Sequence, residues 1–341
     1  MANRRSSKSK KDQPTMHDVA RVAGVSQMTV SRVMRGAGYI SRNVREQVNN
    51  AAREIGYVHN RLAGGIAAYD NPLVGVVVPT LQNRVFTEVL SGISDTLSIA
   101  GLRPVFGVSE YTQAAEEELV FDLLSWRPRG LILAGLEHSD AVRRIVEQTG
   151  VRVAEIMDID GEPMSACFGV SHTEAGRDMA SHLLDRGYRS FGYVASQAGH
   201  DLRATKRFEA FATCIGEGGG QLIAQRTSTE ASSMVVGRHL TQDILAQAER
   251  PDAIYYANDD LAAGGLMHCM SAGIDVPGEV AIAGFNGLGF LSALPQKITT
   301  TQTPRYEIGV AAATWISAPP EATVEKLTDK LETRIHVGDT T

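Results

Sequence analysis

Side chains that can hydrogen-bond or carry charge recur at helical spacing near the beginning of the chain. Gln27 and Ser31 stand four residues apart, as do Met28 and Arg32, so each pair lies on one side of a helix. Val30 falls on the opposite, inward side. This pattern predicts a short helix whose outer face presents an amide, a hydroxyl and a guanidinium to a partner.

Charge is divided unevenly along the sequence. The first 69 residues hold 12 Lys and Arg against four Asp and Glu, a net charge of +8, whereas residues 70–341 carry −14 and the whole chain −6. A basic module on an acidic body indicates that the N-terminal part binds a polyanion, because Lys and Arg gain affinity by displacing phosphate counterions.

A second set of candidate side chains follows predicted buried strands. Positions 79–86, 258–260 and 286–288 each come after an apolar run. Because ligands of parallel α/β sheets bind beyond the carboxyl ends of the strands, these positions are predicted to line a ligand cleft. The candidates are Thr80, Asn83 and Arg84 for polar contacts, Phe86 for an apolar wall, and Asp158 and His172 after later strands.

Three short helices are predicted to position the first set. Thr15 can cap the first helix, Gly24 ends it, and Ser26 can cap the second. Ser41 can cap the third, whose apolar residues recur along one stripe. Three helices with a tight glycine turn between the first two make a helix-turn-helix module.

The second set requires a different scaffold. Beyond residue 72, apolar segments of strand length alternate with amphipathic helical segments, which indicates an α/β fold with parallel sheets. This part is long enough for two sheets separated by a ligand cleft. The predicted strands are Leu73–Val78, Pro104–Val108, Gly130–Leu133, Val151–Met157, Phe191–Ala195, Ala253–Ala257 and Val280–Phe285, and the predicted helices cover 86–100, 114–126, 139–149, 173–186, 202–215, 232–248 and 259–272.

Cysteines and apolar runs restrict the class of protein. Cys167, Cys214 and Cys269 form no CxxC pair, so neither a disulfide framework nor a zinc site is indicated. The basic stretch Arg4–Lys11 is not followed by an apolar run, and no segment approaches about 18 consecutive apolar residues. We therefore expect a soluble, cytoplasmic protein with no metal, no cofactor and no membrane association.

The segment Met16–Met34, continued by Ser41–Tyr57 and Asn60-Arg61, resembles the DNA-binding domain of the LacI/GalR repressor family. The resemblance continues through Val78-Pro79, Tyr256–Asp260, Val276-Pro277, Ile282–Phe285 and Thr300–Pro304, and so covers nearly the whole chain. Within this family, four segments are similar to the gluconate-utilisation repressors: Val78–Ile93, Leu124–Trp126, Glu155–Asp158 and Thr303–Arg305.

The resemblance implies a domain order. We expect a disordered basic arm over residues 1–14, a helix-turn-helix DNA-binding domain over 15–59, a hinge helix and linker over 60–71, and a two-lobed, periplasmic-binding-protein-like effector domain over 72–341. A homodimer is expected, because one short module covers half of a palindromic site on double-stranded operator DNA. The effector would release the repressor from that operator.

Roles on DNA follow from the resemblance. Residues 26–34 would enter the major groove, with Gln27 and Met28 at base-reading positions and Arg32 near a guanine. Gln can bond adenine N6 and N7, Arg can fork onto guanine O6 and N7, and Met can pack against a thymine methyl. Phosphate contacts suit Ser26, Thr29, Ser31, Arg35, Asn43 and Arg45.

Asn60–Ala67 corresponds to the hinge helix, which in this family folds in the minor groove. Asn60 and Arg61 belong to this contact, and Ile66 aligns with the apolar wedge that enters a base step. Gly64-Gly65 departs from the pattern, since each glycine costs about 1 kcal/mol relative to alanine in a helix. The hinge is therefore predicted to be weakly helical away from DNA, which suits a switch.

Roles in effector binding also follow from the resemblance. Arg207 stands where family members carry an effector-binding arginine, and Asn258 matches an effector-contacting asparagine, while Asp259 is predicted to cap the next helix. Asn286 replaces an aspartate found in many sugar-binding members, which removes a negative charge from the pocket. These residues favour a small-molecule effector of the sugar-acid class, such as gluconate or a ketogluconate.

Two other function classes stay open. A regulator of the same fold could sense a neutral sugar or a purine, or be activated by a corepressor. An enzyme on a doubly wound fold is the remote alternative, although no GxGxxG, GxxxxGK[ST], GxSxG or HExxH motif occurs. Turnover of the ligand, rather than binding alone, would identify an enzyme.

Overall fold

A computed structural model describes residues 14–35, 38–58, 71–196, 201–319 and 326–341. The chain divides into two compact units, residues 1–67 and 68–341, each of which is described by itself. The predicted hinge residues Asn60, Arg61 and Ile66, and all of the predicted basic arm except residue 14, lie outside the described residues.

The first unit contains the three predicted helices, α1 (Met16–Val22), α2 (Gln27–Arg35) and α3 (Arg42–Glu54). The predicted caps are present: Thr15 Oγ1 accepts a hydrogen bond from the amide of Asp18, Ser26 Oγ from that of Thr29, and Ser41 Oγ from that of Val44. Gly24 has a φ of +60°, which a turn of this kind requires. The helices share a core centred on the fully buried valines Val19, Val30 and Val48.

The second unit contains two sheets, and we call each sheet with its helices a lobe. The first lobe has strand order β11-β5-β4-β3-β1-β2 with all neighbours parallel. Its elements are β1 (Leu73–Val78), α4 (Arg84–Ile99), β2 (Arg103–Val108), α5 (Gln113–Ser125), β3 (Gly130–Ala134), α6 (Asp140–Thr149), β4 (Arg152–Asp158), β5 (Ala166–Val170), α11 (Arg305–Ser317) and β11 (Leu327–Lys330).

The second lobe has strand order β12-β10-β9-β8-β6-β7, parallel except where β12 runs antiparallel to β10. Its helices pack in two pairs, α7 with α8 and α9 with α10. Its elements are α7 (His172–Asp185), β6 (Ser190–Ala195), α8 (Leu202–Glu217), β7 (Gln221–Thr227), α9 (Met234–Leu245), β8 (Ala253–Tyr256), α10 (Asp259–Ala272), β9 (Ala281–Asn286), a 3-10 helix (Gly289–Ala293), β10 (Thr299–Gln302) and β12 (Arg334–His336).

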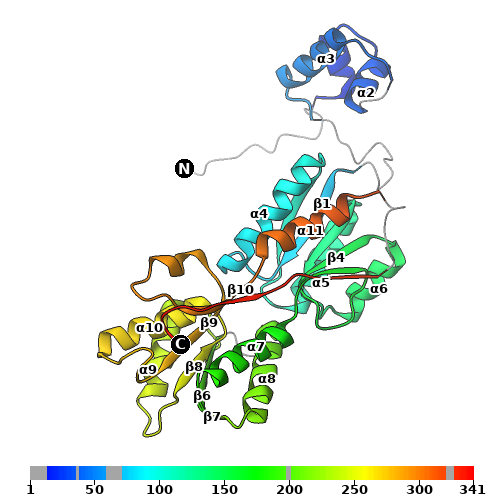
Figure 1. Ribbon diagram of the computed structural model, residues 1–341. Helices are drawn as coiled ribbons and strands as arrows, with labels where there is room; N and C mark the ends of the chain where they lie inside the picture. The colour runs from blue at the N-terminus through cyan, green and yellow to red at the C-terminus, as the bar shows by residue number, and fades with distance from the viewer. Residues whose placement is uncertain (1–13, 36–37, 59–70, 197–200, 320–325) are drawn as a thin grey trace, which may run out of the picture. The chain divides into compact units, whose positions relative to one another are not determined.

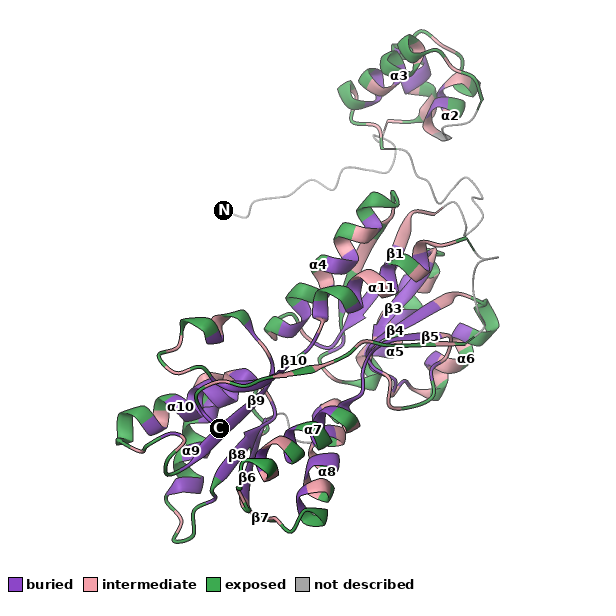
Figure 2. Cartoon of the chain, viewed as in Figure 1, coloured by how far each residue is buried: buried purple, intermediate pink, exposed green. Residues whose placement is uncertain are grey.

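Helices cover both faces of the first sheet. Successive side chains of β1 point to opposite faces, and both sets are buried. Val76 packs with Phe86 of α4 and Ile308 of α11, whereas its neighbour Val77 packs with Val120 of α5 on the other face. Figure 1 shows α4 and α11 side by side, and Figure 2 shows buried strands beneath helices whose outer faces are exposed. The chain crosses between lobes from β5 to α7, from β10 to α11, and from β11 to β12.

The alternating segments predicted from the sequence correspond to observed elements. The helix predicted at 259–272 is α10 with the same bounds, and the strand predicted at Val151–Met157 is β4, displaced by one residue. Helix α11 and the strands β5, β7, β10, β11 and β12 were not predicted from the sequence.

Candidate functional site

A small cavity lies between the carboxyl ends of the two sheets. Its volume is about 30 Å³, which is room for one water molecule. Both lobes contribute to its lining, which consists of Asn83, Val85, Phe86, Met157, Val170, His172, Asp201, Arg203, Arg207, Ala257, Asn258, Phe285, Asn286, Thr303 and Ile308. Of the nine predicted effector residues, Asn83, Phe86, His172, Arg207, Asn258 and Asn286 are among them.

Arg207 is the buried cation of this cavity, with 4% of its surface exposed. Its Nη1 donates to His172 Nδ1 at 2.9 Å and its Nη2 to the carbonyl of Ala257 at 2.8 Å. The guanidinium lies 3.7 Å from the centre of the Phe285 ring. These contacts hold the charge at a fixed place, and Gly176 of α7 makes the position possible, because a Cβ there would collide with the Arg207 carbonyl.

His172 holds Arg207 through a neutral ring. Its Nε2 donates to the carbonyl of Met157 at 2.9 Å, which leaves Nδ1 as the acceptor for Arg207. Burial, and then the charge of Arg207 beside it, lower the pKa of His172 well below its usual value. His172 is thus a positioning residue for the arginine as well as part of the cavity wall.

Two asparagines come from the ends of strands in the second lobe. Asn258 Oδ1 caps α10 by accepting from the amide of Leu261, and it also accepts from Ser232 Oγ, so its amide nitrogen is the group left to donate. The predicted capping residue was Asp259, and that prediction is wrong. Asn286 ends β9 with a φ of +115°, an unusual conformation that fixes where its side chain can lie.

A larger hollow of about 370 Å³ adjoins the cavity at Asn83. Predicted residues Thr80 and Arg84 line it from the first lobe, and Asp260 lines it from the second. The Arg84 guanidinium lies 5.3 Å from the Phe290 ring. A ligand larger than the cavity can therefore extend toward these groups.

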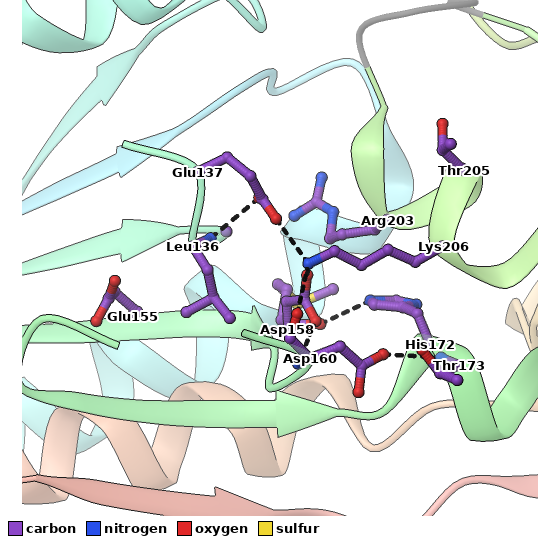
Figure 3. A network of polar contacts seen from close by, with 12 residues as sticks. Leu136, Glu137, Glu155, Asp158, Asp160, His172, Thr173, Arg203, Thr205 and Lys206 are labelled. Carbon is purple, nitrogen blue, oxygen red and sulfur yellow. Dashed lines mark hydrogen bonds and ion pairs between the residues drawn. The ribbon is translucent and has the colours of Figure 1, made fainter. Parts of the chain in front are cut away.

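Among the predicted effector residues, Asp158 lines neither the cavity nor the adjoining hollow. It is fully buried, and its Oδ2 lies 2.6 Å from Lys206 Nζ. The same ammonium lies 2.6 Å from Glu137 Oε1 and donates to the carbonyl of Asp160 at 2.9 Å, as Figure 3 shows. Asp158 is therefore occupied by an ion pair between the lobes instead of facing the cavity.

Sequence reasoning missed Arg203 and Asp201, which both line the cavity. Asp201 caps α8, and its Oδ1 lies 3.6 Å from Arg203 Nε. Arg203 also lies over the Phe86 ring, and its Nη1 is buried with no hydrogen-bond partner among the described residues. The signal for Arg203 was its spacing, because a residue four before Arg207 lies on the same face of a helix.

The outer face of α2 presents the predicted base-reading side chains. Gln27, Met28 and Arg32 are exposed, and Met28 is 65% exposed although it is apolar. Val30 is fully buried on the opposite side. Met28 is therefore accessible to a partner on this face, as the base-reading prediction requires.

The residues predicted to contact phosphates come from the cap and length of α2 and from the first turn of α3. Ser26 is exposed at the start of α2, where its Oγ also lies 2.9 Å from Thr29 Oγ1. Ser31 is half-buried in the same helix, and Arg35 ends it. Asn43 and Arg45 are exposed in the first turn of α3.

Comparison with known proteins identifies the family. Residues 15–60 match the family model of bacterial regulatory proteins of the lacI family, and residues 180–341 match a periplasmic binding protein-like domain. The HTH-type transcriptional regulator GntR of Pseudomonas aeruginosa is 36% identical over 88% of this chain and 87% of its own length. The chain belongs to the LacI family. It is a DNA-binding transcription regulator, as the sequence predicted, and not an enzyme on a doubly wound fold.

Solved structures support the assignment to the LacI family. A LacI-family regulator from Silicibacter pomeroyi is 44% identical, with a TM-score of 0.91 over 96% of this chain and 99% of its own. GntR from Chromobacterium violaceum is 33% identical, with a TM-score of 0.73 over 79% and 98% of the two chains. These likenesses confirm the predicted fold class and the similarity to GntR-type regulators.

The described part of the chain contains neither a candidate metal site nor a candidate membrane-spanning helix. No group of three or more His, Cys, Asp or Glu side chains there could hold a metal ion. None of the helices described is long and apolar enough to cross a membrane.

Proposed function

We propose that this LacI-family regulator is a repressor of sugar-acid catabolism, and that a gluconate-type acid binds in the cavity between the lobes. The observation that carries the proposal is the pair of guanidinium groups, Arg203 and Arg207, which line one cavity from the same face of α8. A guanidinium donates two parallel hydrogen bonds to a carboxylate, and this interaction is strongest where water is excluded.

The rest of the lining supports an anion over a neutral sugar. Asp201 is the one acid among the described lining residues, and it is already engaged by Arg203 and by the amino end of α8. Asn286 supplies an amide where an acid would repel a carboxylate. Asn83, Asn258 and Asn286 can bond the hydroxyl groups of a sugar chain.

The cavity must change to admit such a ligand. Its volume of about 30 Å³ accommodates one water, so a six-carbon acid has to extend into the hollow beside Asn83 or separate the lobes. Either change alters how the lobes meet, and a ligand that prefers one arrangement shifts the population toward it. This is the physical basis on which effector binding would release DNA.

For the DNA end, we propose that a homodimer in the cytoplasm binds a palindromic operator. Gln27, Met28 and Arg32 read bases in the major groove, while the surrounding side chains of α2 and α3 contact phosphates. Asn60, Arg61 and Ile66 contact the minor groove through the hinge. Exposure of the three base-reading side chains on one helix supports this assignment.

A ligand screen coupled to a DNA-binding assay tests the proposal. Thermal shifts of the purified protein are measured with D-gluconate, 2-ketogluconate, D-glucose and purines, and each ligand that binds is added to protein on a labelled operator. Sugar acids should stabilise the protein and release the DNA. Stabilisation by glucose or a purine but by neither acid would replace this effector class with another, and tighter DNA binding would indicate a corepressor.

A further inference from the structure

Lys206 joins the two lobes one residue before Arg207. It projects from α8 of the second lobe onto the first, where its ammonium lies 2.6 Å from both Glu137 and Asp158. A third hydrogen bond goes to the carbonyl of Asp160. All three donors of the ammonium are thereby used by the first lobe, and Figure 3 shows the contacts converging on Nζ.

These contacts pair two carboxylates with one cation, and one of the carboxylates lies beside the cavity. Asp158 has no exposed side-chain surface, and it follows Met157, which lines the cavity. Glu137 is about one-third exposed. A buried carboxylate that loses its cation is costly and repels other anions, so the state of this pair affects what the cavity can accept.

Arg203 is the cation next to this pair. Figure 3 shows its guanidinium beside Lys206 and near Glu137. Burial lowers the pKa of Arg203, but the acidic groups around it raise the pKa overall. Asp201 and Tyr111 contribute most to the rise, and Asp158 and Glu137 add to it. Without Lys206, Arg203 is a neighbouring cation that can neutralise these carboxylates, and its Nη1 has no hydrogen-bond partner among the described residues.

We propose that Lys206 is a specificity-determining residue for anionic effectors: by neutralising Asp158 and Glu137, it keeps Arg203 available in the cavity for the anionic group of the ligand. This inference rests on the proposed sugar-acid function and assigns a role to a residue outside the cavity lining. Lys206 does not touch the ligand. It acts through Arg203 and by neutralising the charges of Asp158 and Glu137.

The test compares three variants with wild type by calorimetric titration with D-gluconate and D-glucose. Lys206→Met removes the cation but keeps the aliphatic stem, and Lys206→Met with Asp158→Asn also removes the buried charge that the lysine neutralises. The matched control is Lys330→Met, since Lys330 likewise pairs with two carboxylates, Glu174 and Glu332, but lies at β11 away from the cavity. Thermal unfolding of each variant checks that it is folded.

A selective loss is expected. Lys206→Met should weaken gluconate binding about tenfold or more, leave any glucose binding within about twofold, and regain most gluconate affinity when Asp158→Asn is added. Lys330→Met should bind as wild type does. The regain in the double variant distinguishes electrostatic control of the cavity from a general loss of structure.

Three results overturn the proposal. The first is that Lys206→Met binds gluconate as wild type does, which rejects this inference and leaves the sugar-acid function intact. The second is that gluconate and glucose affinities fall together and Asp158→Asn does not restore them, which makes Lys206 a structural residue. The third is that wild type binds neither gluconate nor 2-ketogluconate, which rejects the proposed function and this inference with it.

Discussion

His172 accepts a hydrogen bond from Arg207 across 2.9 Å, although both side chains are buried and the arginine is charged. The pair works because the imidazole stays neutral, with its Nε2 hydrogen on the Met157 carbonyl. His172 follows β5, where the chain crosses into the second lobe, and Arg207 belongs to α8. The bond therefore ties the cation of the cavity to the connection between lobes.

Replacing this acceptor should weaken effector binding without removing the cation. His172→Phe fills a similar space but leaves Arg207 Nη1 without its partner, so we expect a loss of about 1–2 kcal/mol in gluconate affinity. His172→Gln, which keeps an acceptor, should lose less. Calorimetry measures both, and equal affinities for wild type and His172→Phe would remove the positioning role.

Operator reading should depend on Arg32. Arg32→Ala should cost about 1–3 kcal/mol on the operator and leave weak binding to random DNA nearly intact. The matched control is Arg53→Ala, an exposed arginine at the end of α3. Fluorescence anisotropy with an operator selected in vitro and with a random duplex gives both affinities, and an equal loss on the two DNAs would exclude Arg32 from base readout.

Stability should fall as the pH rises from about 6.5 to about 9, because of His138. Burial alone would lower the pKa of His138, but Glu116, 2.6 Å away, and Glu155 together raise it to about 9. Because the pKa in the folded protein is above the unfolded value of 6.5, the charged ring stabilises the fold fully below pH 6.5. This stabilisation is lost by about pH 9, and it amounts to at most about 3 kcal/mol of unfolding free energy.

Urea unfolding at several pH values measures this dependence. Burial also raises the pKa of Asp259, to about 7, so its own contribution changes mainly below neutral pH and the interval from 7 to 9 reports on His138. His138→Gln should flatten the curve in that interval. A wild-type curve that is already flat there would show that the ring is not held in its charged form.

Local signals predicted the helices better than the strands. The bounds of α10 follow from neighbouring residues, since Asn258 caps its start and Gly273 ends it in a left-handed conformation. β10 was missed because Thr299–Gln302 contains no apolar run. Its threonines are buried through partners far along the chain, such as Asp259 for Thr300 and Thr341 for Thr299.

The same distinction applies to the candidate site. Arg207, Asn258 and Asn286 could be predicted because strand ends and family resemblance mark their positions. The ion pair of Asp158 could not be predicted, because its partner, Lys206, is 48 residues away and in the other lobe, so only the folded chain shows that the carboxylate is paired. Pairing between lobes is a non-local property that spacing does not encode.

Calorimetric titration with D-gluconate, 2-ketogluconate and D-glucose tests directly whether the cavity binds a sugar acid through Arg207. Wild type, Arg207→Ala and Asn286→Asp are compared. Arg207→Ala should lose on the order of 2–5 kcal/mol toward the acids, because the carboxylate would be buried without its cation. Asn286→Asp should also weaken the acids, through a like charge, and should not weaken glucose binding.

Binding to the operator without effector is the control in this experiment, and both variants should retain it. We expect wild type to bind at least one of the two acids more tightly than glucose, and Arg207→Ala to lose this preference. Wild type that binds glucose but neither acid, or Arg207→Ala with undiminished acid affinity, would contradict it.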